Sequence, residues 1–273
     1  MDAIISAIIL GIVEGITEFL PISSTGHLIV AERLLHFRDV QELFTVIIQF
    51  GAVAAVIWYY RHDLIQKVIG LFRRDSEAIH FWKLLIIGTI PAAVIGLATE
   101  KALTSISTPF VIAISLIVGG IILYFVDRRP SIPYKLRAEQ IDFNSLSVKQ
   151  SLIIGLGQSV AIVPGVSRSG ATIVSGLAVG LNRPTATAYS FYLAIPVMFM
   201  ASALKLLKHH GELSQLSGGI SSILIGLVVS FITALVAITW LLRYVSRHNF
   251  RPFAVYRIVA GIVILGLIAM HVL

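Results

Sequence analysis

The chain of 273 residues is 57% hydrophobic and 13% charged, with a mean hydropathy of +0.91. A soluble domain of this length needs far less apolar sequence, so the composition indicates a polytopic helical membrane protein. The net charge of +7 then reflects loop lysines and arginines beside anionic lipid headgroups and not a nucleic-acid-binding module, and the absence of cysteine excludes disulfides and thiolate chemistry.

The first predicted element is an interrupted apolar segment over residues 3–35. Pro21 and the polar run from Ser23 to Gly26 divide it into two pieces, 3–20 and 28–35, which are both too short to span comfortably. Two short helices joined at mid-depth predict a re-entrant hairpin, whose tip must be buried in protein or line a wet cavity. A basic n-region and a cleavage site are lacking here, so no removable signal peptide is expected.

Full spans and a second hairpin follow along the chain. Three charge-poor segments are expected to cross the membrane, and a polar loop over 129–147 leads to a second broken segment over 150–163 and 170–181. Three further spans complete the chain. We therefore predict an all-α polytopic membrane protein of ten helices in one integral-membrane domain covering 1–273, with full spans at 42–60, 82–100, 109–127, 186–207, 217–242 and 252–272.

Weak internal similarity indicates a duplication of residues 1–128 as 148–273, joined by a cytoplasmic loop over 129–147. An odd number of crossings in each half would invert the second half relative to the first, so that one re-entrant tip enters from each face. The residues that align, with one insertion before the second proline, are Gly11, Glu14, Pro21, Ser23 and Gly26 with Gly155, Gln158, Pro164, Ser167 and Gly170.

Lysine and arginine predict the orientation, because cytoplasmic loops carry an excess of both. One face holds fourteen of these residues and the other holds five, while Arg168 and Arg257 fall within membrane segments. This places the loop 129–147 in the cytoplasm and both termini outside, with the first hairpin entering from the outer face. Arg257 lies near a predicted membrane end, where we expect its side chain to reach the interface without a catalytic role.

Two carboxylates stand in the first hairpin, where ionisable groups are costly and indicate function. Glu14 and Glu18 are four residues apart and share one helical face. Two such carboxylates repel one another unless a proton or a cation lies between them. A hard cation such as Mg²⁺, bound together with substrate phosphate oxygens, would satisfy both, and the alternative is one protonated glutamate that is hydrogen-bonded within the bundle.

Hydroxyl and glycine residues at both tips predict an anion site. Free backbone N–H groups and the positive dipole end at the start of a helix attract phosphate, and two such helix starts would converge near the midplane. Arg168 adds a planar donor fork that suits phosphate oxygens, although an ion pair with either glutamate is an alternative role for it. The expected phosphate-binding or capping residues are Ser23, Thr25, Gly26, Gly165, Ser167, Ser169, Gly170 and Thr172.

A serine hydroxyl needs a base before it can act as a nucleophile. His27 follows Ser24 by three residues, about one helical turn, so its imidazole is within reach of that hydroxyl or of the leaving group. The alternative is a histidine that only satisfies a structural hydrogen bond. Ser24 is better placed than Ser23 relative to His27, but spacing alone leaves the choice of nucleophile open.

The two motifs, Glu14 to His27 and Pro164 to Thr172, resemble those of bacterial undecaprenyl-diphosphate phosphatases, the bacitracin-resistance protein family. The resemblance implies an enzyme of the bacterial plasma membrane that hydrolyses the terminal phosphate of undecaprenyl diphosphate, recycling the cell-wall lipid carrier, with its site towards the outer face. It also implies Glu14 and Glu18 as metal ligands, Glu18, Ser24, His27 and Arg168 as catalytic residues, and Ser167 and Thr172 in phosphate binding.

The mechanism expected from both arguments has Mg²⁺ or Ca²⁺, Arg168 and the helix N-termini neutralising the transferring phosphoryl group. Ser24, activated by His27 or Glu18, would attack phosphorus, and water or His27 are the alternative nucleophiles. Inverted repeats and broken helices are also typical of transporters, so a lipid-carrier flippase, alone or combined with the phosphatase, is the competing function. The expected partners are the lipid substrate and membrane lipids, without nucleic acid, and a homodimer is left open.

Overall fold

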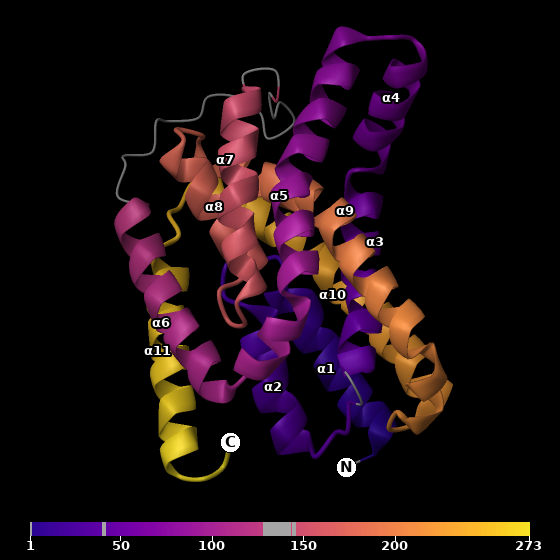
Figure 1. Cartoon of the computed structure of the whole chain (residues 1–273), viewed down its shortest axis with the longest axis vertical. Helices are drawn as coiled ribbons and strands as arrows, with labels where there is room; N and C mark the ends of the chain where they lie inside the picture. The colour runs from indigo at the N-terminus through magenta and orange to yellow at the C-terminus, as the bar shows by residue number, and fades with distance from the viewer. Residues whose placement is uncertain (1, 40–41, 128–142, 144–145) are drawn as a thin grey trace.

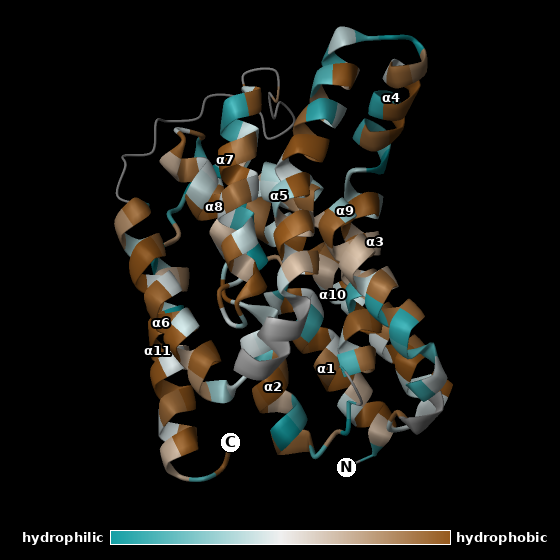
Figure 2. Ribbon diagram, viewed as in Figure 1, coloured by the Kyte–Doolittle hydropathy of each residue, from teal (hydrophilic) through white to brown (hydrophobic). Residues whose placement is uncertain are grey.

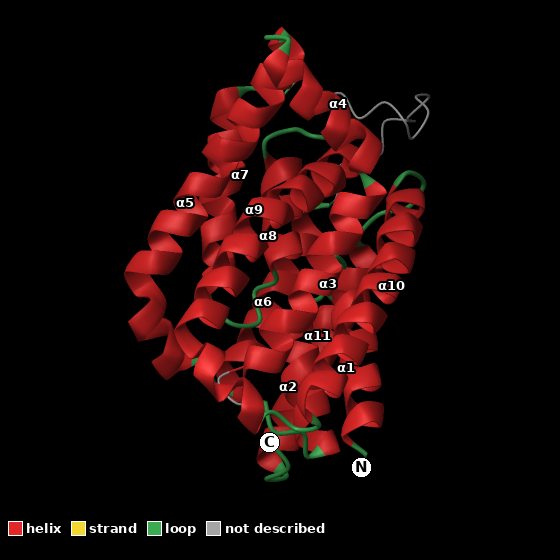
Figure 3. Cartoon of the chain, turned by 90° about the vertical axis from the view of Figure 1, so that its right-hand side faces the viewer, coloured by secondary structure: helices red, strands yellow, loops and turns green. Residues whose placement is uncertain are grey.

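The computed structural model describes residues 2–39, 42–127, 143 and 146–273. In this part of the chain all regular structure is helical, with eleven α-helices and short 3₁₀ turns (Figures 1 and 3). The predicted loop 129–147 falls almost entirely outside the described residues. The bounds of the helices are α1 Ala3–Thr17, α2 Ser24–Leu35, α3 Leu43–Tyr59, α4 Arg61–Phe72, α5 Ser76–Ile106, α6 Pro109–Val126, α7 Val148–Ser159, α8 Arg168–Ala178, α9 Arg183–His209, α10 Gly219–Val245 and α11 Arg251–Ala269.

Several of these helices are long and apolar enough to cross a membrane. Five qualify by themselves, namely α5, α6, α9, α10 and α11, and α3 qualifies together with α4, from which it is bent by 73°. Large apolar side chains remain exposed along them, and brown, the colour of hydrophobic residues, predominates on α6 and α11 in Figure 2. Such a surface is stable only in lipid, so the fold is that of a polytopic membrane protein.

The ten predicted helices correspond to all of these except α4, which lies between the predicted spans 42–60 and 82–100. α4 carries Arg61, Asp63 and Lys67 within twelve residues, so its composition does not indicate a span. It is helical nevertheless because it packs along the start of α5, where Gly70 contacts Ala78 and the Trp82 indole N–H donates to the Lys67 carbonyl at 3.1 Å. Hydropathy identifies helices that enter lipid, but it does not detect a helix that lies outside the lipid and packs against another helix.

Local signals explain where the helices begin. The side chain of Asp2 accepts the Ile4 N–H at the start of α1. Thr108 accepts the Val111 N–H and Asn182 accepts the Thr185 N–H, and both of these capping residues are followed by a proline in the first turn of the helix. These side chains satisfy N–H groups that have no partner within their own helix, and proline in the first turn needs no such partner. The predicted boundaries, drawn from charge-poor apolar sequence, agree with the structure to within a few residues for most spans.

Two short hairpins enter the bundle from opposite ends. Figure 1 shows α1 and α2 at the end of the molecule that carries both termini, and α7 and α8 at the other end. Both hairpins turn back near the middle. Each first helix packs on a long helix of the other half: a Cβ on Gly11 of α1 would lie 2.7 Å from the Gly226 carbonyl oxygen of α10, and one on Gly155 of α7 would lie 2.5 Å from the Gly88 carbonyl oxygen of α5. Only glycine permits these close approaches, and they hold the two tips at the centre of the bundle.

Candidate active site

The first tip is the turn between α1 and α2. α1 ends at Thr17, Glu18 follows it, and Pro21 prevents the helix from continuing. Ser23 then adopts a φ of 70°, a left-handed conformation that is unusual for a residue other than glycine. This strained residue redirects the chain so that α2 begins at Ser24, with its first N–H groups near the middle of the bundle.

The second tip repeats this geometry between η2 (Val160–Ile162) and α8. Ser167 has a φ of 71°, almost the value at Ser23, and its Oγ accepts the Gly170 N–H at 3.1 Å as an N-cap. Gly165 has a φ of 88° and lets this turn pack closely against α6, because a Cβ at this position would lie only 2.6 Å from the Ile112 carbonyl oxygen. α8 therefore begins at Arg168 and presents its N-terminus to the same region as α2.

The two tips contact each other directly. The Ser169 Oγ donates to the Leu20 carbonyl at 2.9 Å, which joins the second tip to the first by a buried hydrogen bond. Arg168 Nη2 lies 3.1 Å from Glu18 Oε1, in an ion pair whose side chains are 11% and 8% exposed. Residues 150 positions apart in the sequence thus form one cluster.

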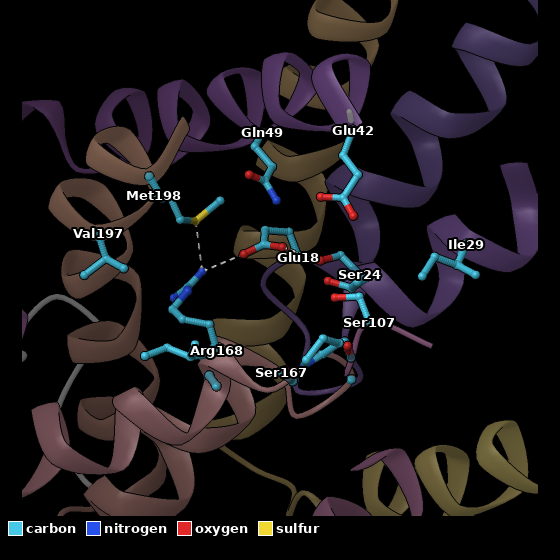
Figure 4. Close-up of a pocket in the computed structure, with 17 residues that line it drawn as sticks. Glu18, Ser24, Ile29, Glu42, Gln49, Ser107, Ser167, Arg168, Val197 and Met198 are labelled. Carbon is cyan, nitrogen blue, oxygen red and sulfur yellow. Dashed lines mark hydrogen bonds and ion pairs between the residues drawn. The ribbon is translucent and has the colours of Figure 1, made fainter. Parts of the chain in front are cut away.

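A cavity of about 350 Å³ opens beside this cluster (Figure 4). This volume is within the range of small-molecule sites. One side is polar and is formed by the two tips, and the other is largely apolar and is formed by α2, η2 and α9. The residues that line it are Glu18, Ser23, Ser24, Thr25, Ile29, Glu42, Gln49, Ser107, Ala161, Ile162, Pro164, Gly165, Ser167, Arg168, Val197, Met198 and Ala201.

Glu18 is the centre of the polar side. The Ser24 hydroxyl donates to Glu18 Oε2 at 2.5 Å, while Arg168 donates to the other carboxylate oxygen. The guanidinium is held in turn by the Ser190 carbonyl, 2.9 Å from Nη1, and by Met198 Sδ, 3.3 Å from Nη2. A carboxylate bonded to a serine hydroxyl can take its proton, and a fixed guanidinium beside them can neutralise phosphate oxygens.

His27 lies away from this triad of side chains. Its Nδ1 is 2.7 Å from the Ser23 carbonyl oxygen, its Nε2 is 2.7 Å from the Tyr256 hydroxyl of α11, and its ring stacks on that tyrosine. It does not line the cavity, and Glu18 holds the Ser24 hydroxyl instead. The expected contact of His27 with Ser24 is therefore not formed, and the contacts of the imidazole are those of a residue that fixes the strained backbone at Ser23.

Glu14 also lies behind the cavity wall. Its side chain is fully buried and neither carboxylate oxygen has a hydrogen-bond partner among the described residues. Gln158, at the aligned position of the other half, likewise has an unpartnered buried Oε1. Buried oxygens of this kind are costly, so Glu14 is poised to accept a proton or a cation.

The predicted phosphate-binding residues divide into two groups. Ser23, Thr25, Gly165 and Ser167 line the cavity. The others pack behind the tips: Gly26 lies against Leu116, Ser169 donates to Leu20, Gly170 lies against Arg257, and the Thr172 Oγ1 donates to the Ser190 Oγ at 2.6 Å. For Ser169, Gly170 and Thr172 the geometry favours the alternative of structural caps, because their polar atoms bond within the protein, whereas Gly26 stands in the first turn of α2, whose N–H groups belong to the expected anion site.

Arg257 was expected to reach the membrane interface, and this prediction is wrong. Its side chain is 1% exposed and lies behind both tips, where the guanidinium donates to the carbonyls of Pro21, Gly165, Val166, Ser115 and Leu116. The correction has a physical reason: carbonyls at two helix breaks have no intrahelical partner, so they create a buried acceptor site that a cation can fill. Gly119 and Gly170 leave the space that this guanidinium occupies.

Gln49 is a cavity residue that the sequence did not lead us to expect. It is a polar residue in the apolar helix α3, and its side chain lines the cavity opposite Arg168 (Figure 4). The signal that was available is the rule applied to the glutamates, that a polar side chain at membrane depth is costly and therefore has a use.

Comparison with known proteins gives a consistent result over the whole chain. Residues 7–263 match the family described as bacitracin resistance protein BacA. A protein of Rhodospirillum rubrum called undecaprenyl-diphosphatase 2 is 46% identical over 266 residues, covering 96% of this chain and 94% of its own length. Proteins called undecaprenyl-diphosphatase from Rhizorhabdus wittichii and Methanococcus aeolicus are 44% and 43% identical, covering 95% and 96% of this chain and 95% and 97% of their own lengths.

Proposed function

The chain belongs to the bacitracin resistance protein BacA family, and from this premise we propose that it hydrolyses the terminal phosphate of undecaprenyl diphosphate to give undecaprenyl phosphate and inorganic phosphate. It is a membrane phosphatase whose product is the lipid carrier of cell-wall synthesis, and its activity accounts for bacitracin resistance. The observation that carries the chemistry is the meeting of Glu18, Ser24 and Arg168 in one cavity between two helix N-termini.

The reaction begins with the diphosphate at the polar side and the isoprenyl chain along the apolar side formed by α2, η2 and α9. Arg168 and the N–H groups at the starts of α2 and α8 neutralise the terminal phosphoryl group. Glu18 takes the Ser24 proton as Oγ attacks phosphorus, and the bond to the bridging oxygen breaks. Undecaprenyl phosphate leaves with the proton, and water, activated by the same carboxylate, releases inorganic phosphate from the phosphoserine.

Ser24 and Glu18 are preferred in these roles for geometric reasons. The Ser24 hydroxyl is bonded to the only carboxylate that the tips present to the cavity, whereas both ring nitrogens of His27 are bonded elsewhere. His27 then serves to hold the Ser23 carbonyl. Direct attack by water, with Glu18 as base, is the remaining alternative, and it differs in forming no phosphoserine.

A divalent cation, Mg²⁺ or Ca²⁺, fits the residues present. The described residues contain no cluster of three or more histidines or carboxylates that could hold a metal ion. Glu14 and Glu18 supply two carboxylates one turn apart, and the oxygens of Glu14 lack any partner within the described chain. Mg²⁺ is commonly held by one or two carboxylates together with substrate phosphates. When bound, such a cation would supply charge neutralisation at phosphate oxygens.

The inverted-topology repeat is part of this proposal. It is supported by the hairpins that enter from opposite ends, by the matching φ values of Ser23 and Ser167, and by the reciprocal packing of α1 on α10 and α7 on α5. With the excess of lysine and arginine at one end, it gives an inner-membrane protein with both termini outside and its site open to the outer face. Because the chain lacks cysteine, single cysteines at Ser217 and Ser246 test this: an impermeant maleimide applied to whole cells should label the first and not the second.

Hydrolysis itself is tested with purified protein in detergent, where no compartments exist, so phosphate release separates hydrolysis from transport alone. Ser24→Ala should lose at least about 10³-fold in kcat, while Ser23→Ala, a matched hydroxyl in the same tip without a bond to Glu18, should lose much less. Acid-quenched wild type should carry phosphate on Ser24. Near-normal turnover of Ser24→Ala would exclude the serine route.

A further inference from the structure

Gln49 is a polar side chain at the cavity that the reaction described above leaves unused. α3 is apolar on both sides of it, with the sequence Val46-Ile47-Ile48 before it and Phe50 after it. Its side chain is half-buried and extends from α3 towards Glu18 (Figure 4). A residue with an amide in such a helix is costly unless the amide is used.

Ser202 fixes the orientation of this amide. The Ser202 hydroxyl, on α9, is 1% exposed and donates to Gln49 Oε1 at 3.3 Å, which is its only hydrogen bond among the described residues. The Gln49 Nε2 makes no hydrogen bond within the described chain. Because an amide has one acceptor oxygen and one donor nitrogen, holding the oxygen on α9 turns the two N–H groups of Nε2 to the cavity side. The pair therefore presents two oriented N–H donors that have no acceptor among the described residues.

The charges around the cavity explain why a neutral donor is suited to this position. The two carboxylates on the cavity wall are already paired, Glu18 with Arg168 and Glu42 with Lys205. A cation at position 49 would be drawn to Glu18, whereas an amide stays available until an anion arrives. Diphosphate brings more negative charge and more acceptor oxygens than Arg168 alone can satisfy.

We propose that Gln49 Nε2 donates to a phosphoryl oxygen of the bound diphosphate, and that Ser202 is the positioning residue that orients this amide. The proposal rests on the function given above, and it adds a substrate-binding residue from α3 to a site otherwise built from the two tips. A donor of this kind binds the ground state and the transition state alike, so its loss should raise KM and leave kcat little changed.

Three variants test the proposal in purified protein. Gln49→Leu removes the donors at similar size and should raise KM about tenfold with kcat within threefold of wild type. Gln49→Glu replaces the donors by a charged acceptor and should raise KM further. Ser202→Ala leaves Gln49 in place but frees its amide, so it should raise KM by a few-fold. Ser222→Ala is the matched control, because that hydroxyl is equally buried, lies on α10 and does not line the cavity.

Binding of inorganic pyrophosphate, measured by calorimetry, reports on Gln49 without turnover. The affinity should fall about tenfold in Gln49→Leu and stay unchanged in Ser222→Ala. Unchanged KM and pyrophosphate affinity in both Gln49→Leu and Ser202→Ala would overturn the proposal, and so would a loss confined to kcat. The two assays test the two proposals independently. Failure of wild-type protein to release phosphate would refute the proposed hydrolysis, whereas pyrophosphate binding by the variants tests the role of Gln49.

Discussion

Arg257→Met tests whether the guanidinium behind the tips organises the site. The substitution keeps a long side chain in α11 and removes both the charge and the five hydrogen bonds. Two of the five acceptors, Ser115 and Leu116, lie within α6 and keep their helical partners. The carbonyls of Pro21, Gly165 and Val166 belong to the tips, and in the described chain they have no other hydrogen bond.

The magnitude follows from these three carbonyls. A buried acceptor left without a partner costs about 1–3 kcal/mol, so the tips in their present position would lose roughly 3–9 kcal/mol. The Arg257 guanidinium has no carboxylate partner in the described chain, so removing this buried charge also removes a desolvation cost of several kcal/mol. This gain offsets much of the loss in the overall free energy of unfolding. We therefore expect the tips to move until their carbonyls meet water. A shift of about 1 Å in a reacting group costs on the order of 100-fold in rate.

The assay is phosphate release in detergent, with thermal unfolding measured on the same samples. Arg257→Met should lose about 100-fold or more in kcat/KM while remaining folded. Arg257→Lys keeps the charge and three donors and should lose less. Arg251→Met, at the exposed start of the same helix, is the control and should retain full activity. Activity of Arg257→Met within threefold of wild type would show that the tips hold their positions without this residue.

Three further results are expected. Burial, with the nearby Asp39 carboxylate, raises the pKa of Glu32 at the end of α2 from 4.5 to about 7. The folded state therefore keeps a proton that the unfolded state releases, so the free energy of unfolding should fall as pH rises from about 4.5 to 7. The melting temperature of Glu32→Gln should fall less than that of wild type over this pH range, and equal falls in the two proteins would contradict the assignment. A chelator should abolish phosphate release and added Mg²⁺ or Ca²⁺ should restore it, whereas full activity after exhaustive chelation would exclude the cation. Gly155→Leu should abolish folding or activity because its side chain would meet the α5 backbone at Gly88, while Gly266→Leu, at an open position on α11, should be tolerated in both respects.

Much of the fold could be predicted because its signals are local. Apolar length and the absence of charge identified the spans, so α6 was expected at 109–127 and lies at Pro109–Val126. The interruption at Pro21 and the motif around Arg168 identified both tips. α4 was missed because its polar composition gives no signal of burial, and its helix depends on packing against α5.

The site was predicted in its composition, and its connections only as alternatives: Arg168 with phosphate or with either glutamate, and Ser24 with His27 or Glu18. Carboxylates, hydroxyls and an arginine at membrane depth have a cost that the sequence alone makes visible, and this identified Glu18, Ser24 and Arg168. The bonds among these side chains depend on how two segments about 150 residues apart pack against each other. Spacing along one helix does not predict such contacts. His27 was expected at Ser24 because one turn separates them, but the direction of its ring is set by Tyr256, on a helix at the other end of the chain.

Hydropathy and residue type are properties of short segments, so the order of amino acids was enough to predict a membrane protein whose chain breaks at two polar tips. The burial of Arg257 behind both tips and the position of Gln49 at the cavity emerge only when the helices pack together. The physical reason is that both assignments depend on partners supplied by other helices: unsatisfied carbonyls at two distant breaks for the guanidinium, and one serine hydroxyl on α9 for the amide.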